Sequence, residues 1–479
     1  MATTGPTGPT GPTSPTSPTG PTDTSGTTTA PAPVGTRPTP PSTRGLLFDL
    51  DALPHRLEAV VAGHDGLALG RSGPVRTAVV CDPGLARELL TRPTGTGQGR
   101  GIAALRLTLG QGLLTSSGDL HRRQRRLVQP AFHPGRLTRY ALDAVRAGRE
   151  RSLAWQQGQR LDLAEEMSSL TLDVVGRTIF GMDVRGDARE VSEAQTDLLR
   201  CFPAIMRPTG LVAARLPTRL GRRVRRNVRR LDRVVEHVVA DRRAHGDAGD
   251  MVSMLLAVRD EETGAPMPAR QVRDEVLTLL LAGHETTAVL LSWAWFELAR
   301  TPSARTALDA ELATAASRAA LDEGAWQSLP VTRAVVAETL RLHPPAYVMG
   351  RVATQDLTLG GTPVRRGTLC FVSPYALGRD PRSWGEDAAV WRPERWLDPA
   401  GGYDETAPGQ PRGAFMPFGA GSRVCIGAAF AQMEATLLLA TLASTWRATV
   451  EPGFDPGLRP LVTLRPRRGV PATLTRVQG

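Results

Sequence analysis

Apolar residues recur at steps of three and four residues between positions 222 and 238. The apolar positions are Val224, Val228, Leu231, Val235 and Val238, and the basic positions between them are Arg222, Arg226, Arg229 and Arg233. This period predicts an amphipathic helix with a basic outer face. A run of arginines of this kind is usually a solvated helix face. A surface that contacts a partner or a membrane is the more specific alternative.

The most apolar segment of the chain runs from Val276 to Leu298. It is long enough to span a bilayer. However, its middle holds the polar run His284-Glu285-Thr286-Thr287, and a charge at that depth in lipid is costly. The pattern therefore predicts a helix buried through the centre of a folded domain, with a polar break facing a cavity, and no transmembrane anchor.

Strand-like segments are few and short. They are Ala78–Cys81, Leu357–Leu359, Thr362–Val364 and Leu369–Val372. Gly360-Gly361 and Arg366-Gly367 separate the last three, which predicts two hairpin turns. The whole pattern predicts a mainly α protein with a minor β portion.

The first 44 residues differ in composition from the rest of the chain. They are rich in Thr, Pro, Gly and Ser and contain no apolar stretch. A segment with so little to bury is expected to be a disordered arm, and it lacks the apolar core of a signal peptide or membrane anchor. The folded body is therefore expected to cover residues 45–479.

Charge and cysteine content narrow the classes of function. The 479 residues include 58 basic ones, all of them arginine, and the net charge is +11. The arginines are spread along the chain, and no zinc-finger or RNA-binding signature accompanies them, so we expect no nucleic-acid partner. The scattered cysteines exclude a disulfide scaffold and suit a cytoplasmic location. They are Cys81, Cys201, Cys370 and Cys425.

The last cysteine lies in a glycine-rich loop, Phe418–Gly427, with the sequence FGAGSRVCIG before an apolar helix. Glycines let the backbone turn tightly and approach a flat ligand, and N–H groups at a helix start can stabilise a thiolate. A buried cysteine is more often inert, but this loop suits an iron-bound sulfur.

The loop resembles the haem-binding signature of the cytochrome P450 family, Phe-x-x-Gly-x-Arg/His-x-Cys-x-Gly, at every defined position. The resemblance implies haem b as cofactor, with the Cys425 thiolate as its axial ligand. It also implies that Phe418 packs near the sulfur, that Arg423 reaches a haem propionate and that Gly427 completes the signature.

Two further segments resemble the family's Glu-x-x-Arg and Pro-Glu-Arg-Phe elements. They are Glu338-Thr339-Leu340-Arg341 and Pro393-Glu394-Arg395-Trp396, with tryptophan in place of phenylalanine. The resemblance implies a structural triad of Glu338, Arg341 and Arg395 that holds the loop on the haem side. Without it, the first pair would be read as a surface salt bridge.

The polar run within the apolar segment, Ala282 to Thr287, resembles the family's oxygen-activation motif. The resemblance implies that Glu285 and Thr286 are catalytic, as an acid and an alcohol that deliver protons to bound dioxygen, and that Gly283 leaves room above the iron. A kink in a Thr/Glu-containing helix is the structural alternative.

Three more residues are implied to bind the haem propionates. His121 and Arg125 match a His-x-x-x-Arg element that stands where many family members have Trp-x-x-x-Arg, and they share one helical face at i and i+4. Arg351 resembles a further propionate contact. Each of these residues could instead be an ordinary surface residue.

The motifs follow the family's order, so the resemblance covers the chain after the arm. It implies the cytochrome P450 fold, a helical prism with a long central helix and a small β-rich region, as one haem domain over 45–479. The implied activity is a monooxygenase that inserts one oxygen atom of O2 into a hydrophobic small molecule. Its electrons would come from a ferredoxin and ferredoxin reductase, or from a flavodoxin.

The segments GDLHRRQRRLVQPAF and GHETT are similar to those of bacterial family members that oxidise terpenoids or fatty acids, and this resemblance implies a terpenoid or lipid-like substrate of secondary metabolism. The segments expected to line the pocket are mostly aliphatic, which favours a largely hydrophobic guest over a sugar or nucleotide. Those segments are 94–114, 202–211, 277–281, 345–349 and 461–463. A polyketide or carrier-bound peptide is the alternative within the same chemistry. A peroxide-using peroxygenase, a haem-thiolate isomerase and a non-catalytic electron carrier are the alternatives outside it.

Overall fold

The computed structural model describes residues 43–477, except 48, 182–184, 208, 247–249, 261–263, 407–409 and 412. These residues belong to one compact unit. Residues 1–42 of the predicted arm (1–44) therefore lie outside the described part of the chain. Thr43 is buried and its hydroxyl donates to the Leu69 carbonyl at 3.0 Å, so the folded part begins before the predicted boundary at residue 45.

Helices make up most of the described chain, as the apolar period predicted. The α-helices are α1 (Leu53–Gly63), α2 (Pro83–Thr91), α3 (Arg100–Leu109), α4 (Gly118–Val128), α5 (Pro134–Ala154), α6 (Leu163–Phe180), α7 (Arg185–Met206), α8 (Gly210–Arg215), α9 (Arg219–His245), α10 (Met251–Ala257), α11 (Ala269–Arg300), α12 (Pro302–Leu312), α13 (Ala315–Glu323), α14 (Pro330–Leu342), α15 (Pro374–Leu377), α16 (Pro381–Trp384) and α17 (Ala428–Ala443). Short 3-10 helices are η1 (Gln129–Phe132), η2 (Trp326–Ser328), η3 (Pro393–Trp396) and η4 (Gly421–Arg423).

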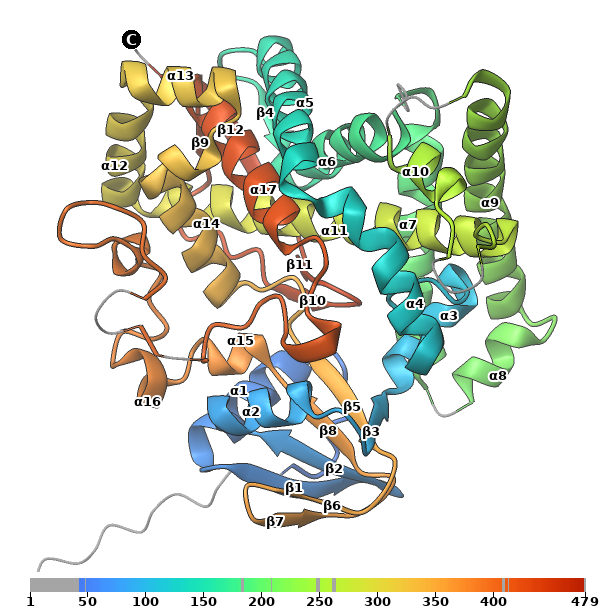
Figure 1. Cartoon of the computed structure of the whole chain (residues 1–479). Coiled ribbons are helices and arrows are strands. Elements are labelled where there is room, and N and C mark those ends of the chain that lie inside the picture. Colours follow the sequence, from blue (N-terminus) through green and yellow to red (C-terminus); the bar gives the residue numbers. More distant parts are fainter. Residues whose placement is uncertain are drawn as a thin grey trace, which may run out of the picture. The chain divides into compact units, whose positions relative to one another are not determined.

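The 32-residue helix α11 is the predicted buried helix, and it runs through the centre of the helical part (Figure 1). Among the described residues it is the one helix long and apolar enough to cross a membrane, but 78% of its apolar window is buried inside the protein. Its C-terminal half carries large side chains, such as Trp293, Trp295 and Phe296, that are buried on all sides. It is therefore a core helix.

Helices α5, α6, α14 and α17 pack around the C-terminal half of α11 in one hydrophobic cluster. Local sequence sets the ends of α6: the Asp162 carboxylate caps its first turn by accepting from Ala164 N at 2.9 Å, and Gly181 ends it with φ +56°. In α17, every residue from Met433 to Ala443 is buried. A helix that is apolar all round is stable only in such an interior.

A second cluster joins α3, α7, α9 and α10 to the N-terminal half of α11. The amphipathic pattern at 222–238 lies in α9, and its predicted valines and leucine face this cluster. Part of the basic face is paired with acids of α7: Arg223 lies 2.8 Å from Asp197 and Arg230 lies 3.0 Å from Glu193. The basic run thus contributes to the α7–α9 interface as well as to a solvated face.

A five-stranded sheet lies beside the helical part, with strand order β1-β2-β8-β5-β3 (Figure 1). Strands β2 and β8 pair in parallel and the other pairs are antiparallel. The smaller sheets are β4-β12-β9, β10-β11 and β6-β7. The strands are β1 (Leu67–Ser72), β2 (Val75–Val80), β3 (Thr96–Gln98), β4 (Arg160–Asp162), β5 (Met349–Ala353), β6 (Leu357–Leu359), β7 (Thr362–Val364), β8 (Leu369–Val372), β9 (Trp446–Thr449), β10 (Leu458–Pro460), β11 (Leu464–Pro466) and β12 (Pro471–Arg476).

One predicted hairpin is confirmed and the other is wrong. Strands β6 and β7 pair around Gly360 and Gly361, which both have positive φ, at +53° and +76°. Arg366 and Gly367 do form a turn, in which Thr368 N donates to Arg365 O at 3.1 Å, but the turn closes no hairpin, because β8 leaves β7 and enters the larger sheet between β2 and β5. All four residues of β8 are buried, so the strand needs a central position that a two-stranded hairpin does not offer.

Candidate active site

The cysteine loop has the tight backbone that its glycines predicted. Gly419 and Gly421 have φ of +73° and +71°, and a Cβ at Gly421 would lie 2.6 Å from the Leu90 carbonyl oxygen. The loop closes where Cys425 N donates to the Phe418 carbonyl at 2.9 Å, and helix α17 begins three residues later at Ala428. The cysteine is thus presented on a rigid turn before a buried helix.

Cys425 differs from the other cysteines in its surroundings. Its side chain is exposed, whereas Cys81, Cys201 and Cys370 are buried. Nevertheless, burial raises the pKa of the Cys425 thiol, against smaller lowering effects of the Gly427 N–H and the Arg125 charge. The sulfur therefore lies within the body of the protein but is accessible to a ligand there.

Helix α11 also has an accessible stripe in its middle. Ala282 is exposed and Thr286 half-buried, although the neighbouring residues His284, Glu285 and Thr287 are buried. Positions i and i+4 share one face of a helix, and the Thr286 hydroxyl donates to the Ala282 carbonyl at 2.6 Å. The alcohol predicted to act on dioxygen is therefore accessible and sits on a face of small residues.

Gly283 lies where α11 packs against α6. A Cβ at this position would come within 3.2 Å of the Val175 side chain on α6. The glycine therefore permits close packing of α11 on α6, while Ala282 lies on the accessible face. Gly283 and Ala282 lie on different faces of α11, because successive positions of a helix are rotated by about 100°.

Glu285 points away from Thr286. Its buried carboxylate accepts hydrogen bonds from Thr463 Oγ1 at 2.6 Å and Arg465 Nε at 2.5 Å, and Arg465 Nη2 forms an ion pair with it. The acid is thus held by the segment at and before β11. The structure does not bring the two predicted proton-transfer groups together.

Thr287, the next residue, joins α11 to α17. Its hydroxyl donates to Glu434 Oε2 at 2.9 Å. Glu434 is completely buried, and within the described part of the chain its Oε1 atom has no hydrogen-bond partner. Burial raises its pKa to about 8. This protonated acid holds the helix that follows the cysteine loop against the centre of α11.

The predicted arginines meet around the cysteine loop and contact backbone carbonyls. Arg125 donates to Val424 O at 2.7 Å and Arg423 donates to Ser116 O at 2.7 Å. Arg106 is a further member, whose guanidinium donates to Thr115 O. Burial and the charges of Arg351, Arg106 and Arg125 lower the pKa of Arg423 to about 10.

In the described part of the chain, none of these four arginines forms an ion pair with a carboxylate. Burial lowers the pKa of Arg351 and Arg423, and buried cations that repel one another are costly unless an anion lies between them. His121 is buried beside them, and its pKa falls to about 4 through burial and the charges of Arg423 and Arg125. It is a neutral donor at pH 7, so the group suits a ligand with carboxylates.

The three residues predicted as a triad form one buried network. Glu338 accepts from Arg341 Nε at 2.8 Å and Nη2 at 2.6 Å, and from Arg395 Nε at 3.0 Å. Trp396 adds a bond that phenylalanine could not make, because its indole N–H donates to Glu338 Oε2 at 2.9 Å. Arg341 also donates to carbonyls of the 378–390 segment, so α14 holds that segment in place.

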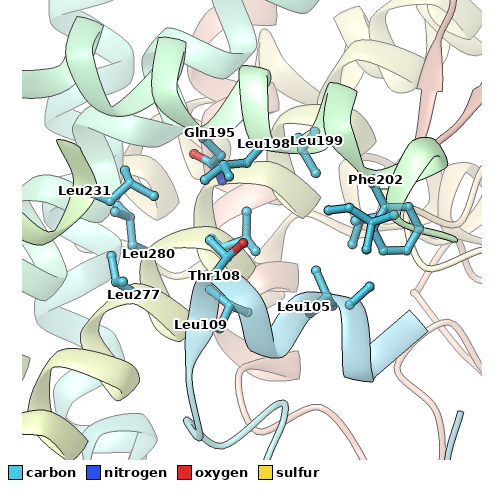
Figure 2. A pocket seen from close by; sticks show the side chains of 14 residues that line it. Leu105, Thr108, Leu109, Gln195, Leu198, Leu199, Phe202, Leu231, Leu277 and Leu280 are labelled. Carbon is cyan, nitrogen blue, oxygen red and sulfur yellow. The ribbon is translucent and has the colours of Figure 1, made fainter. Parts of the chain in front are cut away.

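An apolar cavity lies between α3, α7 and α11 (Figure 2). Four of the five predicted segments contribute to it. Residues 345–349 do not: Tyr347 is buried and donates to Leu461 O at 3.4 Å instead. The lining residues are Ala104, Leu105, Thr108, Leu109, Gln195, Leu198, Leu199, Phe202, Ile205, Leu231, Leu277, Leu280, Leu281 and Val462.

Comparison with known proteins agrees with this geometry. The cytochrome P450 family model matches residues 43–467, which include the cysteine loop, the triad and the central helix. The chain belongs to the cytochrome P450 family. Cyclooctatin synthase of Streptomyces melanosporofaciens is 37% identical over 431 residues, covering 87% of this chain and 91% of the relative.

Two other relatives are similar over most of their length. Cyclooctat-9-en-7-ol 5-monooxygenase of the same organism is 34% identical over 428 residues, 88% of this chain and 91% of its own. Pentalenene oxygenase of Streptomyces avermitilis is 35% identical over 441 residues, 91% and 96% of the two chains. This cytochrome P450 is therefore a monooxygenase that uses haem with a cysteine thiolate as axial ligand.

The residues of this cytochrome P450 fit haem. The accessible sulfur of Cys425 suits the iron, and the arginines without carboxylate partners, with neutral His121, suit the two propionates. Enzymes of this family act on hydrophobic substrates with O2 and take electrons from redox partners. The apolar cavity and the apolar lining of α11 agree with such a substrate.

Sequence reasoning missed several residues of the site. Gln195, Leu198, Leu199 and Leu231 line the cavity from α7 and α9, and Arg106 joins the arginine group. The first four carry no motif, and they form part of a helical face that could equally be ordinary core. The sequence gives no signal that Arg106 belongs to the arginine group, because its membership depends on how α3 packs beside the cysteine loop.

Proposed function

We propose that this cytochrome P450 hydroxylates a terpenoid in secondary metabolism. The observation that carries the proposal is the cavity, whose lining is aliphatic apart from Phe202, Thr108 and Gln195. It reaches the central helix at Leu277, Leu280 and Leu281, next to the accessible stripe of Ala282. Burial of carbon skeleton against such a wall supplies roughly 25 cal/mol per Å², which favours a rigid hydrocarbon-rich guest.

The relatives support the same substrate class. The compounds in two of their names, pentalenene and cyclooctat-9-en-7-ol, are polycyclic terpenoids. A sugar or nucleotide would leave many polar groups without partners in this cavity, at a cost of about 1–3 kcal/mol for each. A polyketide or a carrier-bound peptide is the competing substrate.

Each group of the site has a role in this proposal. Cys425 would hold the haem iron, and the bound haem would supply the oxidation chemistry that inserts one oxygen atom into a C–H bond. His121, Arg125, Arg351 and Arg423 bind its propionates, while Phe418 and Gly427 shape the loop around the sulfur. Thr286 holds a proton at Oγ1 beside the accessible stripe, and the cavity wall orients the substrate and excludes water.

Glu285 is proposed as the residue that passes protons inward from solvent. Its partner Arg465 has a side chain that is 25% exposed, so the ion pair lies between the interior and the surface. The carboxylate must leave Arg465 before it can accept and deliver a proton near Thr286. Rotation of the Glu285 side chain is therefore a step of this proton route.

The electron donors are proposed to be a ferredoxin with its reductase, or a flavodoxin, in the cytoplasm. The described residues contain one P450 unit and no second unit for flavin or an iron–sulfur cluster. Exposed arginines of α4, Arg122 and Arg126, flank Arg125, which contacts the cysteine loop. They suit docking of an acidic redox protein on this side.

The deciding experiment is a ligand screen on purified ferric protein. Terpenes, fatty acids and polyketides are added in turn, and the low-spin to high-spin change is recorded. We expect saturable shifts with terpenoids, and hydroxylated product when NADPH, ferredoxin and reductase are added. A shift confined to polyketides or carrier-bound peptides would overturn the substrate class, and turnover with peroxide but not with O2 and electrons would indicate a peroxygenase.

A further inference from the structure

One polar side chain in the cavity wall has an unsatisfied hydrogen-bonding group. Gln195 on α7 is 4% exposed and lines the cavity. Its Oε1 atom lies 3.1 Å from His284 Nδ1, whereas its Nε2 atom has no hydrogen-bond partner among the residues that the structure describes. Leaving a buried amide donor unpaired is unfavourable. A ligand atom that accepts a hydrogen bond from Gln195 Nε2 would remove this cost.

His284 fixes the orientation of this amide. The imidazole is 2% exposed and lies between two side chains, with Nε2 3.0 Å from Ser168 Oγ on α6 and Nδ1 beside Gln195. Burial lowers the pKa of His284 to about 4, so the ring is neutral at pH 7 and has one donor and one acceptor. Both are used in these two bonds.

The pair can present either polarity to the cavity. With Nδ1–H donating to Oε1, the amide N–H groups of Gln195 are left for a ligand. If the imidazole takes the other tautomer and the amide turns over, the pair stays bonded and the Gln195 carbonyl is left instead. A hydroxyl group can both donate and accept, so it satisfies the amide in both arrangements.

The opposite wall carries a second polar group. Thr108 on α3 lines the cavity, and it carries a hydroxyl group. Figure 2 shows the Gln195 and Thr108 side chains entering the cavity from α7 and α3, among leucines and Phe202. A cavity that is otherwise apolar thus has one small polar region, which is how such sites orient a guest.

We propose that Gln195, oriented by His284, hydrogen-bonds an oxygen atom already present on the substrate. The inference rests on the proposed terpenoid function and narrows it: the substrate is a terpenoid alcohol. A hydrocarbon of the same skeleton would leave the buried amide unpaired. A reaction that installs a hydroxyl, by hydroxylation or by hydration of a carbocation or double bond, must therefore supply this substrate.

The test compares matched probes that differ by one hydroxyl. Cedrene with cedrol and cembrene with cembrenol are titrated into the ferric protein, and the spin-state change gives Kd. We expect the better-binding alcohol to bind about tenfold to a hundredfold more tightly than its hydrocarbon. Gln195→Met, which keeps the length of the side chain but removes the amide, should reduce this ratio to near one without weakening hydrocarbon binding.

Leu199→Ala is the matched control, because it enlarges the same wall without altering the amide. It should weaken alcohol and hydrocarbon alike and keep their ratio. An unaltered ratio in Gln195→Met, or equal affinities in the unmodified enzyme, would overturn the inference. The carbon-monoxide spectrum of each variant confirms that haem is bound normally.

Failure of the terpenoid proposal gives a different result. In that case only long-chain or polyketide probes shift the spectrum, and dodecane with dodecanol becomes the informative pair. A preference for dodecanol that disappears in Gln195→Met would then support hydroxyl recognition while the terpenoid class is rejected. A preference that persists would overturn both.

Discussion

At the scale of single residues, the active site separates groups that adjoin in sequence. Thr286 faces the accessible stripe of α11, Glu285 is paired with Arg465, and His284 reaches Gln195 on α7. Three consecutive side chains therefore lie in three different places: Thr286 on the accessible stripe, Glu285 beside β11 and His284 against Gln195 in the cavity wall. Their divergence follows from the helical turn of about 100° for each residue.

Thr286→Ala should uncouple electron use from product formation. Loss of the hydroxyl removes the group proposed to hold a proton at the oxygen site, so peroxide is released in place of product. We expect the product formed per NADPH to fall by about tenfold or more. Thr286→Ser keeps the hydroxyl and should stay close to the unmodified enzyme; equal coupling in the alanine variant would remove the proposed proton role.

Glu434 should make the stability of the protein depend on pH. Burial raises its pKa from 4.5 to about 8, so the folded state holds a proton that the unfolded chain releases. Its contribution to the free energy of unfolding is complete below pH 4.5 and is lost as the pH rises to about 8. Denaturant titrations should show a smaller decline over this range in Glu434→Gln than in the unmodified protein.

At the scale of elements, one buried carboxylate joins two distant segments. Glu338 on α14 receives bonds from Arg341, Arg395 and Trp396, and the last two belong to η3. A buried ion pair adds little net stability, but removing one partner leaves an uncompensated charge. The network therefore determines where the chain before the cysteine loop is held.

Arg341→Ala should prevent stable haem incorporation, because Glu338 is left without its bidentate partner. We expect a loss of about 3–5 kcal/mol in the free energy of unfolding, measured by denaturation together with haem content per chain. Trp396→Phe removes only the indole bond and should cost about 1–3 kcal/mol while haem content is retained. Equal losses in the two variants would contradict this ranking.

At the scale of the whole molecule, some arginines form ion pairs between helices and others lie exposed on the surface. The arginines of α9 partly pair with acids of α7, while those around the cysteine loop donate to backbone carbonyls and repel one another. The surplus of +11 is therefore not one uniform basic face. What matters for a redox partner is the exposed part near the cysteine.

Reduction by an acidic ferredoxin should slow as salt is added. Screening at 0.15 M reduces the range of surface attraction to about 8 Å, so stopped-flow rates should fall as ionic strength rises. Arg126→Gln should lower the rate at low salt, whereas Arg365→Gln, which removes a charge from the β7–β8 connection, should not. Rates that do not depend on salt would contradict steering to the α4 side.

Local sequence was sufficient where the chemistry depends on neighbours in the chain. The spacing of glycines around Cys425, the Glu338–Arg341 pair and the apolar run of α11 each predicted a local structure that the fold contains, and together they identified the family. Gly360-Gly361 predicted the β6–β7 hairpin for the same reason, since a two-residue turn depends only on its own backbone.

The tertiary structure decided everything that depends on residues far apart in the chain. It placed β8 in the centre of a sheet, turned Glu285 toward Arg465, brought Arg106 to the cysteine loop and set Gln195 in the cavity against His284. No sequence motif predicts these four placements. Each depends on how elements that are distant in the chain pack together, and this packing determines which face of a helix is covered. The sequence was therefore sufficient to predict the cofactor, whereas the shape and polarity of the cavity were determined by the fold.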